Sequence, residues 1–166
     1  MKKIYIAADH AGFEMKGRGL KVIGMWLRES GLAVEWEMVD CGAYELVPTD
    51  DYPDMVESLA EQLTMDLRTG VESRGILFCK TGTGVTIAAN KYLGLRAGNC
   101  FNVEHTRLAV EHNHINVLAL AAEFVDAGRI EEMVEAFLTT EESHDPRHDR
   151  RVAMISQIER IQCFEM

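Results

Sequence analysis

The sequence predicts a single α/β domain over residues 1–166, in which helices cover both faces of a five-stranded parallel sheet. Short apolar runs, typical of buried strands, alternate along the chain with longer segments of helical periodicity. This alternation is characteristic of parallel sheets with helical crossovers, which form three layers. The length suits one domain, which buries roughly two-thirds of its unfolded surface, and no repeat, linker or low-complexity tract divides the chain.

The first half of the chain begins with an apolar strand and a helix with one apolar face. That helical periodicity stops before Gly31, a typical helix terminator. Farther on, a polar loop leads to Pro53, which fits the first turn of a helix. In chain order the expected elements are strand 2–8, helix 13–29, strand 32–39, a helix from Pro53 to about residue 68, and strand 75–78.

The second half repeats the pattern. A glycine-rich loop after the third strand leads into a short helix, and a charged, proline-containing connection at 141–149 precedes the last helix. The remaining expected elements are strand 95–100, helix 103–113, strand 116–120, helix 125–138 and an amphipathic C-terminal helix that starts at about residue 150 and includes 152–161.

Composition narrows the classes of function. A net charge of -10 argues against a nucleic-acid partner, because phosphates require a broad basic surface. No segment approaches the roughly 18 apolar residues of a membrane span, and the start has no cleavable signal pattern, so we expect a cytoplasmic protein. The cysteines lack CxxC spacing, which predicts reduced thiols and no metal site. They are Cys41, Cys79, Cys100 and Cys163.

Polar and reactive side chains follow several of the expected strands. Ligands of parallel α/β sheets bind at the carboxyl ends of the strands. Asp9 and His10 follow the first strand, and Cys79 ends the third. Tyr52 lies beyond the second strand, and the segment after the fourth leads toward His112. We therefore expect these side chains to lie together at one edge of the sheet.

The loop CKTGTG, residues 79–84, places a thiol before a helix start. Such a start carries partial positive charge and unpaired N–H donors, which stabilise a thiolate or an oxyanion. Gly82 and Gly84 allow close approach of a ligand, and Thr81 adds a hydroxyl. The loop matches neither GxxxxGK[ST] nor GxGxxG, so a nucleotide site is poorly supported. The plain alternative is that Cys79 is a small core residue.

A thiolate beside oriented N–H groups suits two chemistries. In acyl transfer Cys79 is the nucleophile, and in proton abstraction next to a carbonyl it is the base while the N–H groups hold an enediolate oxygen. A non-catalytic flavodoxin-like binding module is a third reading of the strand order. The residues alone leave acyl transfer and proton abstraction open, whereas a cysteine at the end of the third strand disfavours the binding module.

Six segments, taken together and in this order, resemble the ribose-5-phosphate isomerase type B family, which also includes galactose-6-phosphate isomerase subunits. They are AADHAGFEMK, TDDYPDM, GILFCKTGTGVTIAANK, GLRAGNC, EHNHINVLAL and PRHDRRV, and the resemblance covers about residues 1–155. It implies a Rossmann-like fold and an aldose–ketose isomerase that needs neither metal nor cofactor. It also implies a homodimer or a dimer of dimers whose active sites are shared between subunits.

The resemblance further implies the reaction and its catalytic residues. Ribose 5-phosphate and ribulose 5-phosphate are the leading pair, with galactose 6-phosphate, allose 6-phosphate or a four-carbon sugar phosphate as alternatives. Cys79 matches the base that moves a proton between C2 and C1 through a cis-enediolate. Thr81, Gly82 and Gly84 match the loop that holds the enediolate oxygen, and His112 matches a histidine that helps to open the sugar ring.

A second group of residues matches substrate-binding positions of the family. By themselves, helix-end histidines and arginines in charged tails are typical of solvated surface, and an aspartate at a helix start is typical of a cap. The resemblance assigns Asn113 beside His112, Asp9 and Tyr52 at the hydroxyl end of the sugar, and His10, Arg147 and Arg151 at the phosphate.

Three residues depart from the family pattern. Lys80 stands where glycine is usual, His114 where aspartate is usual, and Glu123 where many members carry a phosphate-binding arginine. We expect Lys80 either to lie beside the sugar pocket, where it favours the thiolate, or to point to solvent. Glu123 either opposes the phosphate or holds one arginine in place. Three donors remain against one acid, so the expected substrate is still a phosphate.

Overall fold

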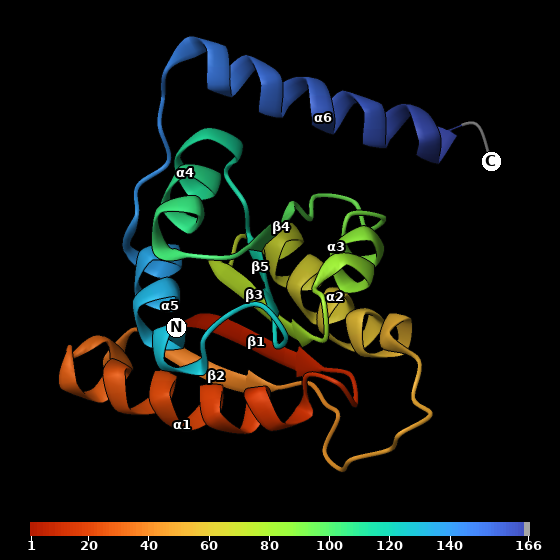
Figure 1. Cartoon of the computed structure of the whole chain (residues 1–166). Coiled ribbons are helices and arrows are strands. Elements are labelled where there is room, and N and C mark those ends of the chain that lie inside the picture. The colour runs from red at the N-terminus through yellow and green to blue at the C-terminus, as the bar shows by residue number, and fades with distance from the viewer. Residues whose placement is uncertain (165–166) are drawn as a thin grey trace.

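The computed structural model describes residues 1–164, with side chains described up to residue 161, and it confirms the predicted three-layer α/β architecture (Figure 1). All neighbouring strands in the sheet are parallel, in the order β2-β1-β3-β5-β4. The strands are β1 (Lys2–Ala8), β2 (Trp36–Asp40), β3 (Ser73–Cys79), β4 (Ala97–Cys100) and β5 (Val117–Ala121).

Helices cover both faces of this sheet. The alternation of side chains along β1 shows why, since Ile4 and Ile6 enter one core while Tyr5 and Ala7 enter the other. The first core packs against α1 (Phe13–Glu29), α4 (Val103–Asn113) and α5 (Ile130–Thr139), and the second against α2 (Tyr52–Thr69) and α3 (Thr83–Ala89).

The register of the central strands aligns their carboxyl ends, where the reactive side chains are expected. Ala8 is opposite Phe78, and Cys79 is opposite Ala121, so β1, β3 and β5 end side by side. The backbone continues this pairing past the strands, because the Ala122 N–H donates to the Cys79 carbonyl at 2.8 Å. The loops after these three strands therefore form one continuous surface.

Two predicted elements begin four or five residues later than their sequence patterns indicate, whereas β4 and β5 begin only one or two residues later. The apolar residues Leu32–Val34 form a 3₁₀ turn after Gly31, whose φ of 78° reverses the chain, and β2 begins only at Trp36. The segment from Val125 is not α-helical at its start either. Asp126 accepts the Gly128 N–H at 2.8 Å and caps a second 3₁₀ turn, after which α5 begins at Ile130.

The last helix, α6 (Pro146–Phe164), begins four residues before the expected position, with Pro146 at its first position. It extends away from the sheet and lies above α4 (Figure 1). Glu159 accepts the Gly94 N–H at 3.2 Å, which ties α6 to the loop before β4. Met154, Ile158 and Ile161 each expose more than half of their surface. Within the described chain, no helix combines the length and apolarity that crossing a membrane requires.

Candidate active site

Cys79 and Asp9 form a buried pair at the carboxyl edge of the sheet. The Cys79 thiol donates to Asp9 Oδ2 at 2.9 Å, and the two residues expose only 7% and 4% of their surfaces. The Gly12 N–H donates to Asp9 Oδ1 at 2.9 Å and fixes the carboxylate. A Cβ on Gly12 would lie 2.2 Å from the carbonyl carbon of Phe78, so only glycine permits this approach between the first loop and β3.

This environment favours the protonated thiol in Cys79. Burial and then the Asp9 carboxylate raise the pKa of Cys79 to about 11, and the N–H groups of Gly82 and Thr81 lower it only in part. The direction of this pKa shift is opposite to the expectation that the loop favours the thiolate. The physical reason is that burial of the thiol, together with the Asp9 carboxylate at hydrogen-bond distance, outweighs the effect of the loop amides. At neutral pH the thiol needs a proton acceptor before it acts as a base.

Glycine is required at position 82 of the loop by both its backbone conformation and its close contact with β4. Gly82 is the N-cap of α3 with φ of 73°, a conformation that favours glycine. A Cβ there would lie 2.3 Å from Asn99 Oδ1, and Asn99 Nδ2 donates to the Thr81 carbonyl at 3.0 Å. Asn99 thus supports the loop from β4, a role that the sequence analysis missed. The only feature of the sequence that could have indicated this role is the amide side chain of Asn99 among the small residues of a short strand.

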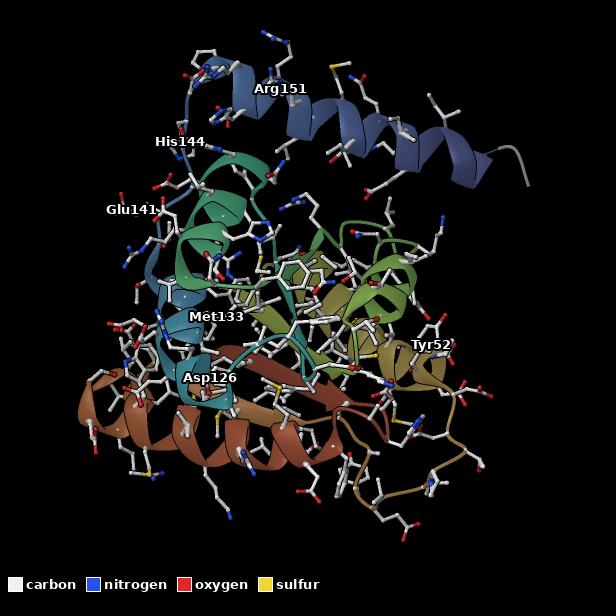
Figure 2. The ribbon with its side chains drawn as sticks, viewed as in Figure 1. Tyr52, Asp126, Met133, Glu141, His144 and Arg151 are labelled. Carbon is white, nitrogen blue, oxygen red and sulfur yellow. The ribbon has the colours of Figure 1, made fainter. Side chains whose placement is uncertain are left out.

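Tyr52 meets the same loop from the opposite side. It opens α2, where Figure 2 shows it, and its side chain is partly exposed. A Cβ on Gly84 would lie 2.9 Å from the Tyr52 ring, so the absence of a side chain at residue 84 lets this ring lie over the start of α3. Asp9 and Tyr52 therefore lie beside the CKTGTG loop, which begins with Cys79 and contains the exposed Thr81.

His10 lies beside this group and is held by a residue that the sequence analysis did not select. Asp50 Oδ1 accepts the His10 backbone N–H at 3.0 Å and lies 2.5 Å from His10 Nδ1. This contact raises the pKa of His10 above its ordinary value, because the Asp50 carboxylate stabilises the charged imidazolium. Asp50 occurs in the quoted segment TDDYPDM, but nothing in that pattern indicates a partner 40 residues earlier.

His112 and its neighbours are not at this edge, so the expectation of a single cluster is wrong within one chain. Helix α4 starts after β4 and runs back to the start of β5. His112 therefore lies near the edge formed by the amino ends of the strands, called the amino edge below. There its ring lies 4.2 Å, centroid to centroid, from the ring of His148. His148 is buried in α6 and is a further residue that the sequence analysis missed.

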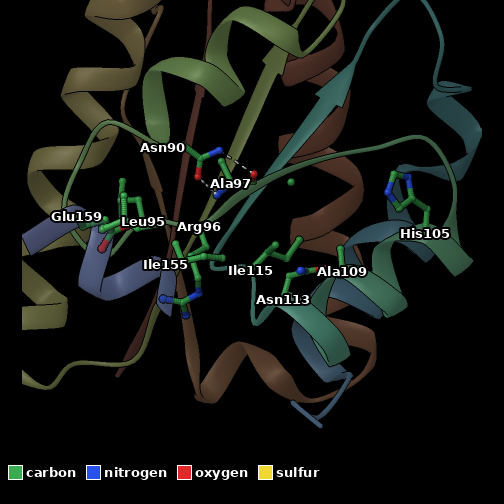
Figure 3. Close-up of a pocket in the computed structure, with 12 residues that line it drawn as sticks. Asn90, Leu95, Arg96, Ala97, His105, Ala109, Asn113, Ile115, Ile155 and Glu159 are labelled. Atoms are coloured by element: carbon green, nitrogen blue, oxygen red, sulfur yellow. Dashed lines mark hydrogen bonds between the residues drawn. The ribbon is translucent and has the colours of Figure 1, made fainter. Parts of the chain in front are cut away.

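The other predicted residues near the amino edge gather around α6. Figure 2 shows Arg151 on α6 and Tyr52 on another side of the molecule. Asn113, at the end of α4, lines a cavity of about 470 Å³ between β4, α4 and α6 (Figure 3). Arg96 and Ile155 also line this cavity, whereas Cys79 does not. The predicted site is therefore divided into two half-sites, one at each edge of the sheet.

Two of the departures from the family pattern contact each other. Lys80 Nζ lies 3.5 Å from Glu123 Oε2, and the Glu123 N–H donates to the Lys80 carbonyl at 3.0 Å. Both side chains are at least half exposed, at 66% and 50%. The Lys80 side chain thus turns to solvent, the second of its two expected orientations, and Glu123 contacts Lys80 and no arginine among the described residues.

The third departure, His114, has a structural role. It caps α4 with φ of 49°, the left-handed region, and its backbone N–H donates to the Val110 carbonyl at 3.0 Å. The side chain is buried, with Nδ1 3.4 Å from Glu142 and Nε2 3.2 Å from the Ser143 carbonyl. These contacts connect α4 to the segment before α6. Within residues 1–164, no group of three or more His, Cys, Asp or Glu side chains is arranged to hold a metal ion.

Replacing Asp9 by asparagine is expected to lower the pKa of Cys79, because a neutral amide no longer opposes a thiolate. The measurement is the rate of iodoacetamide alkylation against pH, with mass spectrometry of the Cys79 peptide. Lys80→Gly is the matched comparison and should leave the midpoint unchanged, since Lys80 is exposed and paired with Glu123. A midpoint that stays in place or rises in Asp9→Asn contradicts this account of the pair.

Comparison with known proteins agrees with the fold. Residues 4–155 match the family described as Ribose/Galactose Isomerase. Ribose-5-phosphate isomerase B of Escherichia coli is 36% identical over 159 residues, covering 96% of this chain and 97% of that protein. Ribose-5-phosphate isomerase B of Mycolicibacterium paratuberculosis is 34% identical over 158 residues, covering 95% and 92%.

Solved structures of ribose-5-phosphate isomerases of type B are also similar to this chain. Ribose-5-phosphate isomerase B of Mycoplasma genitalium, with bound ribulose 5-phosphate, superposes with a TM-score of 0.81 at 32% identity, covering 96% of this chain and 97% of that one. The type B enzyme of Trypanosoma cruzi gives 0.82 at 31% identity, covering 98% and 99%.

The parallel sheet, with a buried thiol and a glycine loop at its carboxyl edge, defines an α/β protein of the isomerase class. The chain belongs to the Ribose/Galactose Isomerase family.

Proposed function

We propose that this protein interconverts an aldose phosphate and its ketose, with ribose 5-phosphate and ribulose 5-phosphate as the substrate pair. The observation that carries the proposal is the buried Cys79–Asp9 pair at the start of the CKTGTG loop. Relatives named ribose-5-phosphate isomerase B match nearly the whole chain, and one neighbouring structure holds ribulose 5-phosphate. The alternatives are galactose 6-phosphate, allose 6-phosphate and a four-carbon sugar phosphate.

The proposed reaction moves one proton between adjacent carbons. Asp9 Oδ2, at 2.9 Å from the sulfur, accepts the thiol proton, and the resulting thiolate removes the proton from C2. The N–H groups at the start of α3 and the Thr81 hydroxyl hold the enediolate oxygen. Cys79 then delivers the proton to C1, the hydroxyl proton of O2 passes to O1, and the proton on Asp9 returns to the sulfur. The same carbon-bound proton is thus removed and replaced, with no change in oxidation state overall.

A homodimer completes the site in this proposal. One chain carries the Cys79 half-site at the carboxyl edge and a second half-site, with His112 and Asn113, near the amino edge. A partner subunit would bring its own His112 half-site to Cys79. The exposed apolar residues of α6 support this arrangement, because they form a surface that a second chain can bury.

The phosphate is proposed to bind between the two half-sites. Arg147 and Arg151 of the partner subunit are four residues apart at the start of α6, so they share one face of that helix. Both are exposed, and guanidinium groups bind phosphate oxygens with strong, charge-assisted hydrogen bonds. His10 adds a donor from the Cys79 half-site. Glu123 offers little opposition, because Lys80 lies beside its carboxylate.

The test is a panel of aldoses and their phosphate esters, assayed for conversion to the ketose. We expect activity on phosphate esters alone, and a loss of about tenfold or more in kcat/KM for Arg147→Ala and for Arg151→Ala. Arg150→Ala, which removes a neighbouring arginine, is the matched control. Equal activity on free and phosphorylated sugars, unaffected by either change, would overturn the proposal. A covalent adduct on Cys79 would instead indicate a thiol hydrolase.

A further inference from the structure

Asp50 makes an unusual set of contacts for a residue of a surface loop. Its side chain is only 9% exposed, although the residue precedes α2 in a mainly exposed segment. Its Oδ1 atom accepts the His10 backbone N–H and lies at hydrogen-bond distance from His10 Nδ1. Its other oxygen, Oδ2, is buried and has no hydrogen-bond partner among the described residues. One carboxylate oxygen therefore serves both the backbone and the ring of His10.

The local sequence explains how Asp50 reaches this position. The Asp50 N–H donates to the Val47 carbonyl at 3.0 Å and closes a turn over residues 47–50. Pro48 is the second residue of this turn, where its fixed φ is favourable. The turn brings Asp50 back toward the loop after β1. The backbone turn thus favours the contact between the Asp50 carboxylate and His10.

This geometry determines which nitrogen of His10 is available. With a carboxylate at Nδ1, the proton on that nitrogen is held by Asp50, and Nε2, on the far side of the ring, is left for other contacts. The His10 side chain is 41% exposed, so a ligand can reach it. The charged groups that act on His10 are Asp50, from the loop before α2, and Asp9, its neighbour in the chain.

We propose that Asp50 is a positioning residue for phosphate binding, which holds His10 so that Nε2–H points to a phosphate oxygen of the substrate. The proposal rests on the proposed function for the role of His10. The charged form of His10 gives the stronger bond to a phosphate, and Asp50 favours that form. Asp50 itself does not touch the substrate. Its carboxylate acts through His10 alone, because its second oxygen is buried.

The first measurement is independent of catalysis. The His10 ring resonances are followed by NMR against pH in the wild type, Asp50→Asn and Asp51→Asn, and are assigned with His10→Gln. Asp50→Asn should lower the pKa of His10, since the amide cannot stabilise the imidazolium. Asp51 is the matched control, because it is the next residue, is exposed, and makes no side-chain cap to α2. An unchanged pKa in Asp50→Asn overturns the proposal.

The second measurement is a binding titration, in which inorganic phosphate is added to the same proteins. The steady-state kinetics of these proteins are then measured with the sugar phosphate as substrate. Asp50→Asn should weaken phosphate binding and raise KM by about tenfold with a smaller change in kcat. The defect should grow as the pH rises above about 6.5, because only the wild-type His10 stays charged there. Asp51→Asn should match the wild type at every pH.

The outcomes separate this proposal from the proposed function. If the wild type isomerises no sugar phosphate but phosphate binding still depends on Asp50, the reaction assignment fails and the positioning role stands. If the enzyme is active while Asp50→Asn keeps wild-type phosphate affinity and KM, the positioning role fails and the reaction assignment stands. A lower pKa of His10 with unchanged phosphate affinity also overturns the proposal, because His10 would then be no phosphate donor.

Discussion

Replacing Cys79 by alanine is expected to remove nearly all isomerase activity while the protein stays folded. A positioned acid–base group typically contributes about 10²- to 10⁴-fold to the rate, and in the proposed reaction Cys79 exchanges the carbon-bound proton. The change removes only one buried sulfur, and Asp9 keeps its bond from the Gly12 N–H. The measurement is kcat on ribose 5-phosphate together with the melting temperature. Cys79→Ser should also be poor, because a hydroxyl rarely ionises.

Cys41→Ala is the matched control for this experiment. Cys41 is also buried, at 3% exposed, and burial raises its pKa to about 11 as well. It packs against α2, where it accepts a hydrogen bond from Gln62 Nε2 at 3.2 Å, and no carboxylate among the described residues is hydrogen-bonded to it. Its loss should affect stability more than rate. If Cys79→Ala keeps more than a tenth of the activity, the thiol is structural, and Asp9 becomes the candidate base.

Two inactive variants are expected to restore activity when their subunits are mixed. Cys79→Ala damages the half-site at the carboxyl edge, and the double variant Arg147→Ala/Arg151→Ala damages the half-site on α6. In a heterodimer, one site receives both defects and the other receives none. Random pairing of equal amounts makes about half of the dimers mixed, so about a quarter of the wild-type activity should return in a twofold-symmetric dimer. The measurement is activity after unfolding and joint refolding of the two variants.

A second mixture serves as the control for this recovery. Cys79→Ala and Asp9→Asn both damage the same half-site, since the two side chains are hydrogen-bonded to each other. Every site in their heterodimers carries one of these defects, so this mixture should stay as inactive as its parents. Recovery in both mixtures, or in neither, would show that the sites are not shared between subunits in the way we propose.

The sequence predicted the sheet and the carboxyl edge because both follow from simple rules. Alternating periodicities gave the strands and helices, and the strand-end rule brought Asp9 and Cys79 together. The same rule failed for His112, which stands at the far end of a crossover helix. Helix α4 has 11 residues, about 16 Å at 1.5 Å per residue, so its last turn lies away from the edge where it began.

The remaining omissions concern contacts that loops determine. The Val47–Asp50 turn places Asp50 against His10, and no periodicity encodes that pairing. The direction of the Cys79 pKa shift could not be predicted from the sequence either, since it depends on the burial of the sulfur and on the balance between a nearby carboxylate and the loop amides. Local patterns predict which elements form, whereas the balance of opposing electrostatic effects requires distances.

The close approach of Gly12 to β3 has a consequence for how this protein tolerates change. A side chain at position 12 would meet the backbone carbonyl of Phe78, and repacking of neighbouring side chains cannot relieve a clash with backbone. Lys80, by contrast, is largely exposed one residue beyond the thiol. At the carboxyl edge of the sheet, position 12 thus accepts only glycine, whereas position 80 can accept other side chains. Redesign of substrate preference should therefore begin at Lys80 and Glu123 and leave the first loop untouched.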